Sequence, residues 1–220
     1  MRRTGTQRGG TLLEAARQAR ERAAEYLLGL QYPEGYWWGE LTADSTLESD
    51  YILLQLWLYP PEGGVWRPAS RPVVDKAVRS ILARQLPDGG FNIYPQGPAD
   101  VSATVKAYFA LKLAGMVAED PRLKRARERI LELGGIQAAN SYVKINLSLF
   151  DLYPRAYCPS VPPEIVLLPG KFLYQMSSWT RAILAPLAVV QAHNPRRPVP
   201  AGFTLEGTIP AGPPPGVPLG

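Results

Sequence analysis

Apolar residues recur every three or four positions along most of the chain, the spacing typical of an α-helix. Between residues 100 and 117, for example, Val101, Val105, Tyr108 and Leu111 fall on one broad face. Comparable segments, bounded by capping residues, glycines or prolines, predict helices over residues 11–30, 45–59, 72–84, 100–117, 121–134, 140–152 and 177–193. No stretch of the sequence shows the alternation typical of a strand, so the sequence predicts an all-α fold.

Several of these helices have recognisable start and stop signals. Residues 11–14 and 45–48 each carry Thr or Ser followed three positions later by Glu, which is the spacing of a capping box. Asp120 before Pro121 combines an N-cap with a proline at the first helical position. Gly134 is well placed to end the helix that starts there.

Composition divides the chain into three parts. Residues 1–10 are basic and Gly-rich and lead into no apolar core, so we expect a disordered N-terminus and no signal peptide. Residues 11–194 carry the helical pattern and are predicted to form one domain. Residues 195–220 are crowded with Pro and Gly and predict an extended or disordered tail. Five prolines between residues 154 and 169 predict an irregular crossing before the last helix.

Two turns repeat the same residues after a helix. Gln31, Gly35 and Trp37 occupy the same offsets as a second set that lies 54 residues later, namely Gln85, Gly89 and Phe91. A helix is expected to end near each Gln, the Pro and Gly turn the chain, and the aromatic ring folds back against the helix end. The Gln amide can then bond backbone groups left unpaired at helix termini. Helix pairs at a fixed period favour a stacked or circular array.

This repeat resembles the QW motif of the triterpene cyclases. Segments similar to squalene–hopene cyclases in particular follow in order along the chain: 35–41, 47–51, 87–95, 100–112, 161–165 and 176–181. The resemblance covers about residues 15–200. It implies a partial α/α barrel, or toroid, built from helix pairs. It also implies that the two Gln/Gly/aromatic sets are structural repeats.

Composition adds few constraints. The chain is 46% hydrophobic and 20% charged, with a net charge of +5, as in ordinary globular proteins. No nucleic-acid-binding motif is present, so we expect no nucleic-acid partner; an anionic membrane surface is the better reading of the positive charge. A single Cys158 excludes an internal disulfide and fits a reducing compartment. With His193 as the only histidine, a Cys/His zinc site is not expected, and neither is any other metal site or cofactor.

The resemblance implies a reaction that this chain cannot perform by itself. Family members protonate a terminal alkene of squalene and guide a carbocation cascade, with an acid from an Asp-x-Asp-Asp motif in their other, C-terminal barrel. That motif is absent here, where the seven aspartates are isolated from one another. Protonating an alkene needs an unusually strong acid, which a lone surface carboxylate cannot supply. Glu48 is expected to cap a helix and Asp50 to lie on a helix surface, so we assign no catalytic residue.

The expected contribution of the chain is pocket wall. Trp179, in a Ser-Ser-Trp-Thr-Arg segment, matches a family position that faces the substrate cavity, and Tyr142 lies where the resemblance implies another pocket aromatic. Aromatic faces stabilise passing cations through the ring quadrupole. Core packing is the alternative for both residues. Cys158 is expected to be inert, and His193 to lie at a helix C-terminus.

Three departures from the family pattern matter. Phe91 replaces the usual Trp, which keeps an aromatic ring but loses the indole donor. The segment 169–176 is a few residues shorter than in the family, which puts the approach of Trp179 to the cavity in doubt. The sequence also ends before the acid-bearing barrel. We therefore expect a truncated or frameshifted product, or one part of a split cyclase.

The sequence thus predicts the N-terminal α/α-barrel region of a squalene–hopene cyclase-like protein that contributes pocket wall to an intramolecular cyclase (an isomerase). Expected partners are squalene or a related isoprenoid lipid, a C-terminal half that carries the acid, and a membrane surface. The expected location is the cytoplasm, peripheral to the inner face of the cell membrane. One alternative is a non-enzymatic interaction domain or relic that kept the fold. A weaker alternative is a subunit related to protein prenyltransferases, which needs Asp, Cys and His zinc ligands.

Overall fold

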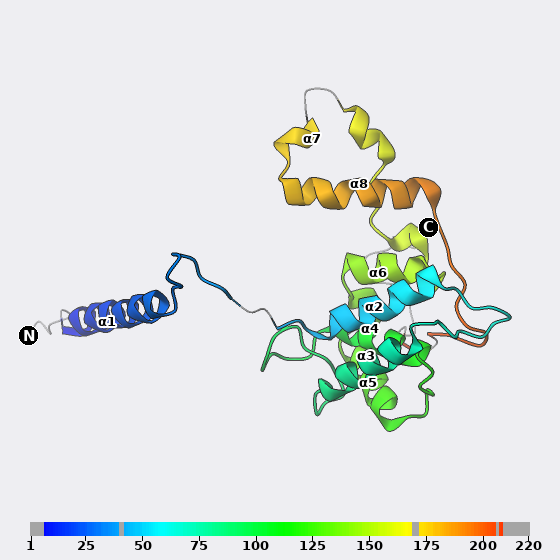
Figure 1. The fold of residues 1–220 in the computed structure, drawn as a ribbon, viewed down its shortest axis with the longest axis horizontal. Helices are drawn as coiled ribbons and strands as arrows, with labels where there is room; N and C mark the ends of the chain where they lie inside the picture. Colours follow the sequence, from blue (N-terminus) through cyan, green and yellow to red (C-terminus); the bar gives the residue numbers. More distant parts are fainter. Residues whose placement is uncertain (1–6, 40–41, 169–171, 206, 209–220) are drawn as a thin grey trace, which may run out of the picture. The chain divides into compact units, whose positions relative to one another are not determined.

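The structure is a computed structural model that describes residues 7–39, 42–168, 172–205 and 207–208 (Figure 1). These residues contain α- and 3₁₀-helices and no strand. The α-helices are α1 (Gln7–Gly29), α2 (Ser45–Leu58), α3 (Arg71–Ala83), α4 (Val101–Leu113), α5 (Pro121–Glu132), α6 (Ser141–Ser148), α7 (Phe172–Gln175) and α8 (Ser178–His193). The 3₁₀-helices are η1 (Ile136–Ala138), η2 (Arg155–Tyr157) and η3 (Pro163–Leu167). The predicted all-α class is confirmed.

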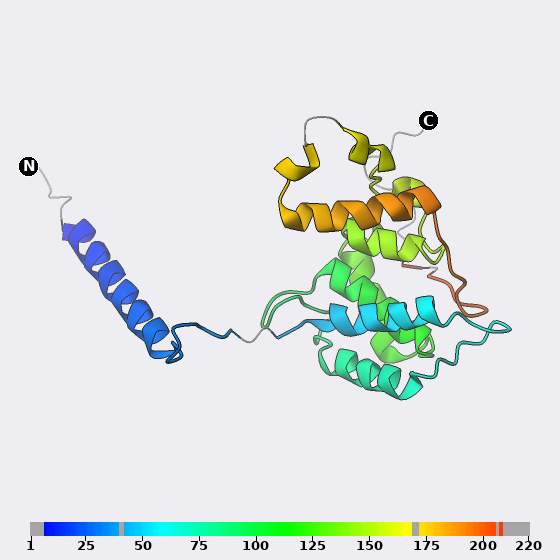
Figure 2. The same cartoon turned by 45° about the horizontal axis from the view of Figure 1, so that its top comes forward.

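The chain folds as two units. The first, Met1–Thr42, holds α1 and the turn that follows it; the second, Ala43–Gly220, holds the remaining helices. Within the second unit, α4 contacts α2, α3, α5 and α6. Figure 1 and Figure 2 show α3 and α5 together on one side of α4, and α6 on the other. This alternation of inner helices (α2, α4, α6) and outer helices (α3, α5) is the pairing expected in part of an α/α barrel.

The hydrophobic pattern explains which helix lies inside. Ten of the thirteen residues of α4 are buried, because its small and apolar residues surround the helix on every side. The outer helix α3 instead buries a single stripe, Val74, Ala77 and Ile81. In α5 the matching stripe is Leu123, Ala126 and Ile130. A helix with one apolar stripe covers the core and faces solvent, whereas α4 needs partners all round.

Side-chain caps fix the starts of most inner and outer helices. The N-cap residues of α2, α4, α5 and α6 are Asp44, Asp100, Asp120 and Asn140, and the side chain of each accepts from a backbone N–H of the first turn. The prediction for Asp120 is therefore confirmed. The expected capping box at 45–48 is wrong: the carboxylate of Glu48 leaves α2 and bonds the hydroxyl of Ser80 and the guanidinium of Arg84 on α3.

Three predicted helix limits also differ from the structure. α1 begins at Gln7, so Thr11 lies inside the helix instead of capping it. α4 ends at Leu113 instead of residue 117, because Gly115 with φ +103° turns the chain. α6 ends at Ser148, since Leu152 N–H returns to Leu147 O and closes the helix. In contrast, Gly134 has positive φ, as a helix C-terminus there requires.

The first half of the proline-rich tail packs on the core. Residues 195–205 and 207–208 form no helix, yet Leu205 and Thr208 are buried. The ring of Phe203 meets that of Phe109 on α4 edge to face, with 5.3 Å between centroids. Backbone hydrogen bonds run from Arg197 N to Leu149 O, from Ala201 N to Gly64 O and from Ile136 N to Thr208 O. The rest of the predicted tail, and residues 1–6 of the predicted N-terminal segment, lie outside the described residues; the domain limits stay predictions.

Candidate functional site

The two repeated turns have the same hydrogen bonds. In the first, Gln31 Nε2 donates to Gly35 O at 2.7 Å; in the second, Gln85 Nε2 donates to Gly89 O at 2.9 Å. The glycines have φ of +92° and +86°, a region that L side chains rarely adopt. The Gln amide therefore closes its own turn. We expected it to bond the end of the preceding helix, and that expectation was wrong for these two bonds.

The aromatic residues of the two turns behave differently. Trp37 Nε1 donates to Leu27 O at 2.6 Å, so the indole folds back on the last turn of α1. Phe91 has no such donor, and its ring is fully buried in the core. Its backbone N–H donates to Thr104 Oγ1 on α4, whose hydroxyl donates in turn to Asp100 O. Phe91 thus anchors the second turn by burial and through the backbone.

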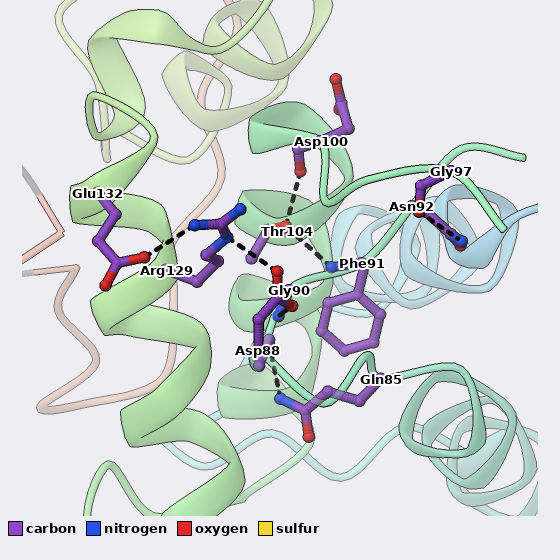
Figure 3. Close-up of polar contacts among 11 residues, drawn as sticks. Gln85, Asp88, Gly90, Phe91, Asn92, Gly97, Asp100, Thr104, Arg129 and Glu132 are labelled. Atoms are coloured by element: carbon purple, nitrogen blue, oxygen red, sulfur yellow. Dashed lines mark hydrogen bonds and ion pairs between the residues drawn. The ribbon is translucent and has the colours of Figure 1, made fainter.

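The second turn is also tied to α5, as Figure 3 shows. Arg129 on α5 pairs with Asp88 in the turn at 3.1 Å and with Glu132 at 2.8 Å. Gln85 Nε2 donates to a second acceptor, Arg122 O, at 2.9 Å. The turn therefore fastens an outer helix to the core, and this supports a structural role for the residues Gln85, Gly89 and Phe91.

A cavity of about 1010 Å³ opens between the inner helices. Most of its lining comes from α2, α4 and α6 and from the residues that flank them, with Ile93, Val190 and Pro195 completing the wall. The lining residues are Asp44, Thr46, Asp50, Leu53, Leu54, Trp57, Ile93, Asp100, Ser102, Ala103, Lys106, Asn140, Tyr142, Asn146, Leu149, Phe150, Val190 and Pro195. This volume is in the range of small-molecule binding sites.

Polar residues line the cavity at matching positions of the three inner helices. The N-cap residues Asp44, Asp100 and Asn140 all line it, and so do the residues six positions after each cap, Asp50, Lys106 and Asn146. Six helical residues correspond to a rise of about 9 Å. The wall thus carries a polar ring at the helix N-termini and a second ring about 9 Å deeper.

An ion pair joins two members of the deeper ring. Lys106 Nζ lies 2.8 Å from Asp50 Oδ2, and the side chain of Lys106 is only 12% exposed, against 41% for Asp50. The other carboxylate oxygen, Asp50 Oδ1, is buried and accepts no hydrogen bond from any described residue. Asp50 was predicted to lie on a helix surface; this was wrong, because the equivalent position of α4 carries a lysine. The 56-residue separation left only one signal in the sequence, opposite charges at equivalent repeat positions.

The two predicted substrate-facing aromatics are not brought together. Tyr142 lines the cavity and is half exposed, in the first turn of α6. Trp179 stands in the first turn of α8, is 76% exposed and is not among the described residues that line the cavity. Part of the segment 169–176, which we expected to affect Trp179, lies outside the described residues. Contact of either residue with substrate stays a prediction, whereas Trp57, which sequence reasoning missed, lines the cavity.

The remaining candidate groups have structural roles. Asp120 caps α5, and the hydrogen bonds from Arg122 hold the pKa of its carboxyl below the usual range. Cys158 is buried, and His193 lies in the last turn of α8, as expected. Within the described residues, no group of three or more His, Cys, Asp or Glu side chains could hold a metal ion. The same part of the chain contains no helix long and apolar enough to span a bilayer. The cavity can bind a ligand, but its carboxylates cap helices or pair with lysine.

Comparison with known proteins agrees with this architecture. The squalene-hopene cyclase N-terminal domain matches residues 21–213. The squalene–hopene cyclase of Alicyclobacillus acidocaldarius is 36% identical over 194 residues, which cover 86% of this chain and 30% of that enzyme. The enzyme of Zymomonas mobilis is 37% identical over 178 residues, 80% of this chain and 26% of the relative. A dammaradiene synthase of Dryopteris crassirhizoma is 33% identical over 186 residues, 81% of this chain and 25% of the relative.

The chain spans less than a third of the length of these relatives. The match nevertheless includes both repeated turns, the three inner helices and Trp179, because it extends from residue 21 to residue 213. The all-helical fold and the paired arrangement of inner and outer helices agree with it. The chain therefore belongs to the squalene-hopene cyclase N-terminal domain family.

Proposed function

We propose that this chain forms part of the wall of an isoprenoid cavity in a triterpene cyclase of the squalene–hopene type. The observation that carries the proposal is the cavity between α2, α4 and α6, which has the volume of a ligand site and whose deep end is apolar. The names of two of the relatives specify squalene as the compound cyclised. Squalene is a hydrocarbon, so burial of apolar surface would supply most of its binding free energy.

Trp57 and Tyr142 are the aromatic residues of the wall that could stabilise a carbocation. A cation over the face of an aromatic ring gains about 0.5–2 kcal/mol, and more when water is excluded. Trp57 is held in place by an edge-to-face contact with Phe150 at 6.0 Å. Such a fixed ring suits a wall that must keep its shape while charge moves along the substrate.

The acid must come from outside residues 1–220. The sequence contains no Asp-x-Asp-Asp motif, and Asp44, Asp50 and Asp100 of the cavity are engaged as caps or as an ion pair. A carboxylate in such a setting is a poor donor to an alkene. A C-terminal cyclase segment, in the same polypeptide or in a partner chain, would supply the acid and close the cavity.

Co-expression tests this proposal. The chain is produced in a host that makes squalene, together with the C-terminal remainder of the Zymomonas mobilis relative, and lipids are analysed by gas chromatography and mass spectrometry. We expect pentacyclic triterpenes only when both polypeptides are present. If the pair assembles but yields no cyclised product, while the intact relative does so in the same host, the cyclase role is refuted.

One observation favours an interaction domain as the alternative. Large apolar side chains are exposed on α7, α8 and η3, namely Leu167, Tyr174, Trp179 and Val189. A contiguous apolar patch of this kind marks a surface that a partner covers. In the cyclase, that partner would be the C-terminal segment. In an interaction domain, the purified chain alone would unfold cooperatively and show little binding of a hydrophobic dye.

We also propose a cytoplasmic location at the inner face of the cell membrane. The support is the lipid character of squalene and the net charge of +5, which favours an anionic surface. Fractionation of cells that express the chain with its partner segment tests this proposal. Recovery in the membrane pellet and release by high salt are expected, whereas recovery in the soluble fraction at low salt would refute it.

A further inference from the structure

The cavity wall changes from polar to apolar along the same three helices. On α2 the lining runs from Asp44 through Asp50 to Leu53 and Trp57; beyond Asn146 at α6, it continues with Leu149 and Phe150. Polar groups therefore occupy the two rings near the helix N-termini, and hydrocarbon surface follows. A pure hydrocarbon matches only the second half of such a wall, because burying the polar half against it leaves charged groups without partners.

The Asp50–Lys106 pair is the part of the polar half that can bind a ligand group directly. An ammonium has three donors, and the structure gives Lys106 Nζ one acceptor, Asp50 Oδ2. The carboxylate is also short of donors, since Oδ1 accepts no hydrogen bond from the described residues. The two groups therefore offer a donor and an acceptor side by side at the start of the apolar surface.

A hydroxyl group satisfies both members of the pair. Its O–H can donate to the Asp50 carboxylate while its oxygen accepts from Lys106 Nζ. A phosphate or carboxylate could accept from Lys106, but it would meet the negative charges of Asp44, Asp50 and Asp100 in the same cavity. An amine could donate to Asp50, but it would be repelled by Lys106. An alcohol is the class of head group that fits without repulsion.

We propose that this cavity binds an isoprenoid alcohol, with its hydroxyl on the Asp50–Lys106 pair and its hydrocarbon chain along Leu53, Trp57 and Phe150. The inference rests on the proposed function, since it names the substrate class of the same cavity. It makes Asp50 and Lys106 specificity-determining residues, which select an oxygenated isoprenoid over a hydrocarbon of the same length.

The test measures the affinity of the whole 220-residue chain for three probes with one carbon skeleton. These are farnesol, the hydrocarbon farnesene and farnesyl diphosphate, with squalene as a fourth probe, all followed by equilibrium dialysis. A hydrogen bond to a charged group is expected to favour farnesol over farnesene by about ten-fold. Farnesyl diphosphate is expected to bind more weakly than farnesol because of the acidic lining.

Variants assign the preference to the ion pair. The double variant Asp50→Leu/Lys106→Met replaces the pair with apolar residues, a change that proteins often tolerate without loss of stability. Its ratio of farnesol to farnesene affinity should fall to about one, while farnesene binding is retained. Asp75→Asn is the matched control, because it breaks the exposed Arg71–Asp75 pair on α3, away from the cavity. This control should keep the ten-fold preference.

Three results would overturn the inference. Farnesene could bind as tightly as farnesol, farnesyl diphosphate could bind more tightly than farnesol, or the double variant could keep the preference for the alcohol. In each case, binding of farnesene and squalene would still support the proposed function. If none of the four probes binds, the proposed function fails as well, and the two failures are thereby distinguished.

Discussion

Gly89 allows the second turn to lie directly against α5, and replacing it should separate two energetic effects. Its φ is +86°, and a Cβ built there would lie 2.6 Å from the backbone carbon and from the Cβ of Arg125, and 2.7 Å from its carbonyl oxygen. These atoms belong to a helix, so they cannot move without shifting α5. Gly89→Ala should therefore combine backbone strain with a steric clash.

Gly115→Ala provides the matched comparison. Gly115 also has positive φ, +103°, but a Cβ there would meet no heavy atom of the described residues within 4 Å. Strain from a positive φ costs about 1–2 kcal/mol, partly offset by about 0.4–1 kcal/mol from the stiffer unfolded chain. The clash at Gly89 adds about 1–3 kcal/mol of overpacking. We expect Gly89→Ala to destabilise the protein by about 2 kcal/mol more than Gly115→Ala.

Urea unfolding followed by circular dichroism at 222 nm measures this difference. With a slope of about 2 kcal/mol per M, the midpoints of the two variants should differ by about 1 M. The hydrogen bond from Gln85 to Arg122 O should be lost with the clash, so amide exchange near the start of α5 should also quicken. If the two variants unfold within about 0.3 M of each other, the turn does not press on α5 as the structure indicates.

Three further predictions concern stability and the site. Thr104→Val should cost about 1–3 kcal/mol in unfolding free energy, because it leaves the buried N–H of Phe91 unpaired, whereas Thr104→Ser should retain most of the stability. Leu205→Ala should cost about 2 kcal/mol and Leu167→Ala almost nothing, as urea unfolding would show, since only the first side chain is buried. Trp179→Ala should change stability by less than about 0.5 kcal/mol, yet lower triterpene yield several-fold in the co-expression assay; an unchanged yield would remove Trp179 from the substrate wall.

Local signals explain what the sequence predicted well. The cap at Asp120, the glycine at the end of α5 and the irregular crossing after α6 depend on residues within a few positions of one another. Turn geometry follows the same rule, because a Gln four residues before a Gly can close only that turn. Interactions that join distant segments were missed. Glu48 bonds Ser80 and Arg84 in place of its own helix start, and no short-range pattern announces this choice.

The tail shows the same limit from the opposite direction. Residues 195–208 have the composition of a disordered segment, yet Phe203 and Leu205 pack against the core. A proline-rich strip needs no periodicity to be ordered, since it can follow a groove that other helices provide and bond their free backbone groups. The bond from Arg127 Nε to Gly207 O, which fixes the strip to α5, is an example. Composition predicts the absence of helix there, and the shape of the core determines the rest.

The repeat contained one signal that reaches beyond local structure. The turns repeat every 54 residues, whereas the caps Asp44 and Asp100 are 56 residues apart, as are Asp50 and Lys106. Because equivalent positions of neighbouring inner helices face each other, unlike charges at one such position predict a bridge across the cavity wall, and the 2.8 Å pair is that bridge. An apolar residue at both positions would suit a hydrocarbon cavity equally well for packing. The presence of a charged pair at this depth, where desolvation costs free energy, therefore argues that the polar group contributes to ligand selection.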